Sequence, residues 1–310
     1  MTSKIEGSGN LFIIGNGFDI DLGFPTTYRD FVNNNNAPEY GEFPFRGDGA
    51  GYYALGRFIQ QRATINNWYG LEDILAKYGS LKYISVNEDP QETEKENRND
   101  YELLVSRLFS YLNSLDYKQP NQGSVAARIL RMYKDATPTV YSFNYTNLVS
   151  IASALGLYYD EPYYVHGSLK NKNIILGVGD YAELGNTADF MYKTSNPCYR
   201  SSQLFEDLDK CETVIIFGLS LSRVDYPYFE GFFKKIASGA YHAKKYVRII
   251  TASEHSKMEI LRNLRRMNDG MISLFNNSDF DIIRTKDDID EEKVIALIDR
   301  IAHTKCASLK

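Results

Sequence analysis

Short apolar runs rich in β-branched residues recur along the chain and predict its strands. The first run is Leu11–Ile14, which ends at Gly15. The later runs are Thr139–Phe143, Tyr163–His166, Ile174–Leu176, Thr213–Phe217, Val247–Thr251 and Phe280–Ile283. Most of them are apolar throughout instead of alternating, which is typical of strands buried on both faces of a parallel sheet.

Stretches with helical periodicity lie between these runs. The predicted helices are Ser124–Tyr133, Asn147–Leu155, Arg200–Leu208, Tyr226–Ala237, Ser256–Met267 and Glu291–Ala302. The alternation predicts an α/β protein with a doubly wound, mostly parallel, Rossmann-like sheet.

The region from about Pro38 to about Lys134 breaks the alternation, because it contains no convincing strand. Its helical patterns are Ala54–Ala63, Leu71–Ile84 and Asp100–Leu115, with a charged run at Glu88–Asp100 that we expect to be exposed. Leu71, Ile74, Leu75 and Tyr78 have i, i+3, i+4, i+7 spacing and are expected to face inward. We therefore predict a helical insertion over 38–134 and a Rossmann-like nucleotide-binding domain built from 1–37 and 135–310.

Composition narrows the functional classes. The net charge of −5 argues against a dedicated nucleic-acid binder, so no nucleic acid is expected as a partner. The three cysteines are scattered and form no C-x-x-C pair, which argues against a disulfide framework and a structural zinc site. No apolar run approaches the roughly 20 residues of a membrane span, and no signal peptide is evident, so we expect a cytoplasmic protein without membrane contact. The sequence leaves the oligomeric state open, and a homo-oligomer is one of the states that it allows.

The first candidate site is the turn Gly15-Asn16-Gly17-Phe18-Asp19, directly after the first strand. Glycines there allow a tight turn through which a pyrophosphate can approach main-chain N–H groups. The alternative is a purely structural role, in which this is a tight strand-to-helix turn that binds no ligand. Carboxylates repel phosphate, so Asp19 and Asp21 would have to point elsewhere or bind ribose hydroxyls.

Three more clusters follow predicted strands. Asn144, Tyr145 and Thr146 come after the second strand, where they could orient a ribose, although Thr146 or Asn147 could instead cap the next helix. His166 and Gly167 end the third predicted strand, and the alternative to a functional role is that His166 only packs in the core. Gly218 and Ser220 follow a later strand, with Asp225 as a helix cap or a ligand-binding residue.

These clusters resemble the blocks of the AbiH family, which is implicated in bacterial abortive infection against phage. The stretch IIGNGFDIDLGFPTTYRDF at Ile13–Phe31 is similar to the opening signature of that family. SFNYTN, VHGS and FGLSLSRVDYPYF match its later blocks in the right order. The first block adds Thr26, Tyr28 and Arg29 to the candidate binding residues.

AbiH proteins in turn resemble sirtuins distantly. Gly15, Gly17 and Gly23 match the glycines of the sirtuin nucleotide loop, and the sirtuin asparagine and catalytic histidine fall on Asn144 and His166. Asp19 replaces a serine, Thr146 replaces an aspartate, Arg29 is shifted by one residue, and the paired zinc cysteines are absent. Protein deacylation is therefore not expected.

The resemblance implies NAD, as substrate or ligand and without a metal, and hydrolysis of its nicotinamide–ribose bond, so we expect an NAD glycohydrolase-like hydrolase. Asn144 and His166 would be catalytic, with His166 bonding a ribose hydroxyl or acting as general base. The alternative is a non-catalytic nucleotide sensor or regulatory protein of a defence system. No cluster of metal ligands in the sequence supports nucleic-acid cleavage. The phage trigger is unknown in either case.

Overall fold

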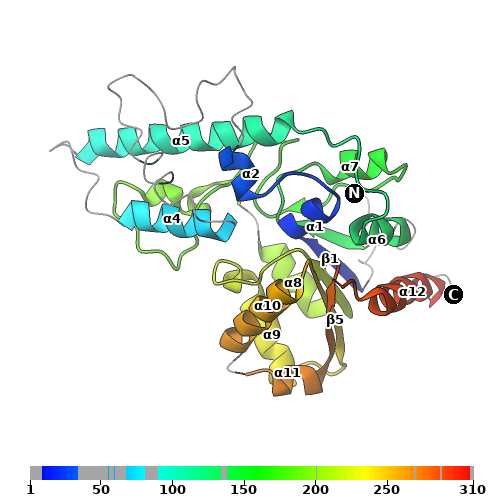
Figure 1. Cartoon of the computed structure of the whole chain (residues 1–310). Coiled ribbons are helices and arrows are strands. Elements are labelled where there is room, and N and C mark those ends of the chain that lie inside the picture. Colours follow the sequence, from blue (N-terminus) through cyan, green and yellow to red (C-terminus); the bar gives the residue numbers. More distant parts are fainter. Residues whose placement is uncertain are drawn as a thin grey trace, which may run out of the picture. The chain divides into compact units, whose positions relative to one another are not determined.

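The computed structural model describes residues 9–33, 55, 59, 68–80, 90–133, 138–199, 201–268, 270–286 and 288–307 (Figure 1). The chain divides into two compact units. The first, here called the sheet unit, comprises Met1–Phe24, Asp116–Val165 and Arg200–Lys310. The second unit comprises Pro25–Leu115 and His166–Tyr199. The first segment of the second unit begins and ends earlier in the chain than the predicted insertion over 38–134. The second unit also includes a later segment, His166–Tyr199, that the prediction did not assign to it.

The sheet unit contains one six-stranded sheet in which every neighbouring pair is parallel. Its strands are β1 (Asn10–Ile14), β2 (Thr139–Ser142), β3 (Tyr163–Tyr164), β4 (Thr213–Phe217), β5 (Lys245–Thr251) and β6 (Ser278–Arg284). The spatial order β3-β2-β1-β4-β5-β6 is that of the doubly wound Rossmann fold, so the predicted fold class is confirmed. β1 and β4 are buried at every position, as expected for central strands with helices on both faces.

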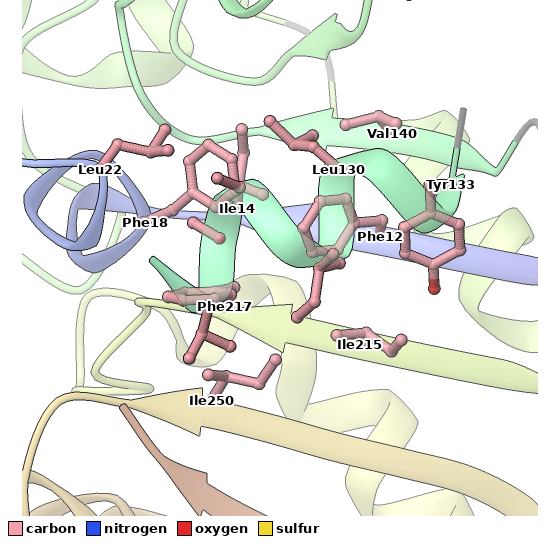
Figure 2. Packing of buried hydrophobic residues seen from close by; sticks show 14 of the residues in the cluster. Phe12, Ile14, Phe18, Leu22, Leu130, Tyr133, Val140, Ile215, Phe217 and Ile250 are labelled. Atoms are coloured by element: carbon pink, nitrogen blue, oxygen red, sulfur yellow. The ribbon is translucent and has the colours of Figure 1, made fainter. Parts of the chain in front are cut away.

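Helices cover both faces of this sheet (Figure 1). One face packs against α1 (Asn16–Asp21), α6 (Val125–Tyr133), α7 (Leu148–Ala154) and α12 (Glu291–Ala307). In Figure 2, Phe12, Ile14 and Phe217 of the strands lie among Leu130 and Tyr133 of α6. The other helices are α8 (Ser202–Lys210), α9 (Tyr226–Ala237), α10 (Glu254–Met267) and α11 (Ile272–Asn277), which group around α9 on the opposite face.

The second unit is mainly helical in its described part. It contains α2 (Tyr28–Asn33), α4 (Trp68–Ser80), α5 (Pro90–Ser114) and the short 3₁₀ helices η3 (Asp189–Met191) and η4 (Lys193–Ser195). The four positions of α4 predicted to face inward, Leu71, Ile74, Leu75 and Tyr78, are all buried, which confirms the helical spacing. The Tyr78 hydroxyl donates to Asn97 on α5 at 3.2 Å.

One predicted strand is wrong. Ile174–Leu176 is not a strand: it is a buried segment of the second unit, where the N–H of Ile175 donates to the carbonyl of His166 at 2.9 Å. A short apolar run signals burial without specifying strand pairing, which explains the error. The charged run Glu88–Asp100 is mostly exposed in its described part, as predicted, and it is helical from Pro90 onward, where α5 begins. An i, i+4 pair of Arg98 with Glu94 supports that helix.

Other predicted elements lie only partly within the described residues or differ in length from the prediction. Ala54–Ala63 lies outside the described residues except for Leu55 and Ile59, which are helical and buried. The third predicted strand is shorter than expected, and α11 was not predicted. None of the described helices is both long and apolar enough to cross a membrane.

Candidate functional site

The glycine turn after β1 lies where the order of the sheet reverses. From β1 the chain proceeds outward through β2 and β3 and then returns to place β4 on the other side of β1. Gly15 follows β1 and Gly218 follows β4, so both turns stand at the carboxyl ends of the two strands that flank this reversal. Ligands of open α/β sheets bind at this kind of position.

The two turns approach each other so closely that neither tolerates a side chain. A Cβ on Gly17 would lie 2.6 Å from the Gly218 Cα, and a Cβ on Gly218 would lie 2.4 Å from the Phe18 nitrogen. Gly218 also has a φ of 75°, which an L side chain rarely adopts. These glycines therefore have a structural role in the fold, whatever ligand binds beside them.

Main-chain donors of the first turn are already used within the protein. The N–H of Gly17 donates to the Gly218 carbonyl at 3.0 Å, and the N–H of Phe18 donates to the Gly15 carbonyl at 2.9 Å. The Phe18 ring is fully buried and packs edge-on against Phe217 at 5.4 Å between centroids. A phosphate bound here in this conformation would have to use other donors. Asn16 and Gly17 are half-buried and thus stand at the accessible side of the turn.

Asn144 ties the end of β2 to the glycine turn. Its Nδ2 donates to the Gly15 carbonyl at 3.0 Å, and its N–H donates to the Ser142 hydroxyl at 3.2 Å. The side chain is buried. The predicted catalytic amide and the predicted binding turn are therefore neighbours within one rigid edge of the sheet.

Asp19 is a buried carboxyl at the same edge. It is 1% exposed, and its Oδ2 accepts a hydrogen bond from the Thr146 hydroxyl at 2.9 Å. Its Oδ1 is buried and has no hydrogen-bond partner among the described residues. Burial raises the pKa of Asp19 to about 7, although the side chains of Thr146 and Asn144 act to lower it. Tyr145, between those two residues, is half-buried.

Two neighbouring polar residues are explained by helix capping. Asp21 is buried, and its Oδ2 accepts from the N–H of Ala126 near the start of α6 at 2.8 Å. The Asn147 side chain accepts from the N–H of Ser150 at 3.1 Å and caps α7, so of the two capping candidates Asn147 is the cap. Thr146 is left to bond Asp19.

Ser220 and Asp225 organise the loop after β4. The Asp225 carboxylate accepts from the N–H of Ser222 at 2.9 Å and from the Ser220 hydroxyl at 3.3 Å. Asn263 of α10 donates to the Ser220 carbonyl at 3.1 Å. Asp225 stands at the N-cap position of α9, yet its side chain makes no capping hydrogen bond. Its contacts hold the loop that presents Gly218 to the first turn.

His166 begins the second unit and is buried, with 8% of its surface exposed. Burial lowers the pKa of His166 well below its usual value, and the positive charge of Lys193 lowers it further. The following Gly167 has a φ of 73°, and a Cβ there would lie 1.9 Å from the Asn173 carbonyl oxygen. The imidazole is therefore held neutral, which argues against the role of general base expected for His166 from the sequence.

The Lys193–Glu72 pair was not anticipated from the sequence. The Lys193 ammonium donates to a Glu72 carboxylate oxygen at 2.7 Å, and Lys193 is only 4% exposed. The two residues are far apart in the chain, on η4 and α4, so no local spacing could have indicated the pair. A buried ion pair is weak evidence for stability, because its burial costs desolvation. The charge of Lys193 does act on His166, whose pKa it lowers.

The remaining predicted binding residues also belong to the second unit. Thr26 and Tyr28 are buried and Arg29 is exposed. Burial raises the pKa of Tyr28 to about 12. Thr27 and Asp30 bond each other's main-chain N–H groups, both at 3.0 Å, in the manner of a capping box at the start of α2.

The predicted site residues thus fall in both compact units. The sheet unit brings together Gly15, Gly17, Asp19, Asn144, Thr146 and Gly218. His166, Thr26, Tyr28 and Arg29 belong to the second unit. Within the described part of the chain, no three His, Cys, Asp or Glu side chains gather in the manner of a metal site.

Comparison with known proteins identifies the family. No curated protein and no solved structure shows significant similarity to the chain. The family model described as bacteriophage abortive infection AbiH matches residues 11–244, a span that contains every candidate site residue named above. Because this match covers most of the 310 residues, the chain belongs to the AbiH family of bacteriophage abortive infection proteins.

Proposed function

We propose that this AbiH protein acts in phage defence by binding NAD at the carboxyl edge of β1, β2 and β4 and hydrolysing its nicotinamide–ribose bond. The observation that carries the proposal is the hydrogen bond from Asn144 to the Gly15 carbonyl at 3.0 Å. It joins a polar amide after β2 to the glycine turn at the reversal of the sheet. NAD is proposed as the ligand from the sequence resemblance alone, in which Gly15 and Gly17 fall on glycines of the sirtuin nucleotide loop and Asn144 falls on the sirtuin asparagine.

The reaction makes modest demands on the protein. Cleavage of the nicotinamide–ribose bond develops positive charge on the ribose, so the site must hold the sugar, exclude bulk water and admit one water molecule. Asn144 would orient the nicotinamide ribose or that water. His166 of the second unit is neutral because of burial and Lys193, so it is in the form that exchanges hydrogen bonds and not in the form that carries a proton. Depletion of NAD in an infected cell would account for abortive infection.

The test is NAD consumption by the purified full chain, together with calorimetric binding of ADP-ribose. Asn144→Ala should lose at least 10-fold in turnover while remaining folded. Asn147→Ala is the matched control, because it removes a similar amide three residues away that caps α7. Equal turnover of the wild type and Asn144→Ala, or absence of binding to both NAD and ADP-ribose at millimolar concentration, would refute the proposal.

A nucleotide sensor without chemistry is the second candidate. The N–H groups of Gly17 and Phe18 are already bonded to carbonyls, which leaves fewer main-chain donors for a phosphate than a Rossmann turn usually offers. A sensor can bind its ligand through rearrangement of this turn and pass the change to other parts of the chain. Binding of ADP-ribose without NAD consumption, both in vitro and in phage-infected cells, would favour the sensor.

A further inference from the structure

The inference concerns the buried carboxyl of Asp19 and rests on the proposed NAD hydrolysis. Hydrolysis requires a group that accepts a proton from the attacking water. His166 is a poor acceptor, because burial and the Lys193 charge both oppose its protonation. The sheet unit holds another candidate beside Asn144.

Asp19 has the contacts of a proton acceptor. The Thr146 hydroxyl donates to its Oδ2 at 2.9 Å, and its buried Oδ1 has no hydrogen-bond partner among the described residues. A buried polar atom left in this state costs free energy and calls for an explanation. Asp21, two residues later on the same helix, is by contrast satisfied by the N–H of Ala126. Because Oδ1 has no hydrogen bond within the described part of the chain to stabilise a negative charge, the Asp19 carboxylate is a better proton acceptor than a fully bonded one such as that of Asp21.

We propose that Asp19 accepts the proton of the hydrolytic water through the hydroxyl of Thr146. A hydroxyl both donates and accepts, so Thr146 can pass a proton to the carboxylate to which it already donates. Thr146, at the position of the sirtuin aspartate, is then the relay. Asp19, at the position of the sirtuin serine, is the proton acceptor.

The step balances as follows. The water oxygen forms a bond to C1′ of the ribose, and the bond from C1′ to the nicotinamide nitrogen breaks, with its electron pair remaining on nicotinamide. The water proton passes to Oγ1 of Thr146 while the Thr146 hydroxyl proton passes to Oδ2 of Asp19. The products are ADP-ribose, nicotinamide and one proton, which Asp19 later releases to solvent.

The groups around Asp19 fit this role. Thr146 and Asn144 face it from the turn after β2, and Tyr164 of β3 is close enough for the Asp19 charge to raise the pKa of the tyrosine. Asp19 itself titrates near pH 7, the range in which a general base is most effective.

The experiment compares the pH dependence of NAD turnover in variants of the full chain. Wild-type turnover should rise with pH through about 7, since the carboxylate form is the acceptor. Asp19→Asn and Thr146→Val should lose about 10²–10⁴-fold and lose this rise, because general-base help has that size. Thr146→Ser, which restores the hydroxyl, should recover most of the activity. Asp21→Asn keeps an acceptor for Ala126 and is the matched acidic control, with the wild-type pH profile expected.

The outcomes separate the two proposals. If the wild type turns over NAD and Asp19→Asn keeps both rate and pH profile, the relay is refuted while NAD hydrolysis stands. A Thr146→Ser variant as inactive as Thr146→Val would also refute the relay. If the wild type neither binds ADP-ribose nor consumes NAD, the hydrolase proposal fails and the relay with it. Thermal unfolding of each variant, and retained ADP-ribose binding, identify any that lose activity only through misfolding.

Discussion

The two compact units each bury an ionisable side chain that the sequence marks as a candidate site residue, and the pKa values of the two shift in opposite directions. In the sheet unit, burial raises the pKa of Asp19 to about 7, and the side chains of Thr146 and Asn144 partly offset this effect. In the second unit, the positive charge of Lys193 adds to the burial of His166, and its pKa falls well below the ordinary value. Burial alone disfavours charge on both groups. Burial is the larger influence on both pKa values, and the neighbouring side chains oppose it at Asp19 and add to it at His166.

This contrast assigns separate roles to two groups that look equivalent in sequence. Each lies near the end of a predicted strand, and each is of a residue type that can transfer protons. Only Asp19 has a pKa matched to proton transfer at neutral pH, whereas His166 is kept in the form that exchanges hydrogen bonds. The following predictions test the contrast from the largest expected effect to the smallest.

The first prediction removes the charge beside His166. Lys193→Met should destabilise the protein by about 3–5 kcal/mol, because it removes one partner of a buried ion pair and leaves the Glu72 charge behind. The pKa of His166 should rise towards its usual value of 6.5. Urea unfolding measures the first effect and NMR titration of the imidazole the second.

The double variant Lys193→Met with Glu72→Gln serves as its control. It removes both charges, so it should regain part of the lost stability while keeping the raised pKa of His166. An unchanged His166 pKa in both variants would show that burial alone holds the imidazole neutral. The charge of Lys193 would then not explain the difference between His166 and Asp19.

The second prediction uses stability to read the protonation of Asp19. The folded protein holds this proton up to about pH 7, whereas the unfolded chain releases it near pH 3.8. Stability from this group is therefore present below the unfolded pKa and is lost as the pH rises towards 7, by up to about 4 kcal/mol at 1.36 kcal/mol per pKa unit. Asp19→Asn should abolish that loss in urea unfolding measured between pH 4 and pH 8.

His166 acts in the opposite direction over part of this range. Its lowered pKa means that the unfolded chain takes up a proton below about pH 6.5 and the folded protein does not, so its contribution falls as the pH falls. His166→Gln should remove that acid-side loss. If Asp19→Asn leaves the pH dependence of stability unaltered, the buried carboxyl does not titrate near neutrality and the contrast fails.

The third prediction tests the backbone turns beside the two groups. Gly218→Ala and Gly167→Ala should each cost about 3 kcal/mol, because each combines a positive φ with a Cβ that meets backbone atoms at 2.4 Å and 1.9 Å respectively. Gly156→Ala is the matched control: its φ is 73°, but nothing lies within 4 Å of its Cβ. It should cost only about 1 kcal/mol.

Thermal unfolding of the three glycine variants gives the comparison. Equal losses in all three would mean that the positive φ accounts for the whole effect. The close approach of Gly218 to the first glycine turn would then need another explanation. The same geometry makes Gly17→Val unsuitable as a test of ligand binding, since its side chain would meet Gly218 whether or not a phosphate is present.

Much of the sheet unit was determined by the sequence alone. Runs such as Thr213–Phe217 and periodic stretches such as Tyr226–Ala237 match β4 and α9 residue for residue, because burial of a parallel strand on both faces and of one helix face leaves a local pattern. The blocks around Gly15, Asn144, His166 and Gly218 placed the chain in the AbiH family. Those blocks also selected the edge of the sheet at which β1 and β4 end.

Tertiary structure decided what local pattern could not express. The run Ile174–Leu176 is as apolar as a strand, yet it packs in the second unit, because apolar content records burial and does not record a hydrogen-bonding neighbour. The bond from Thr146 to Asp19 and the pair of Lys193 with Glu72 join residues more than a hundred positions apart. The charge that a buried group carries depends on such neighbours, which are set by chain folding and not by spacing along the chain.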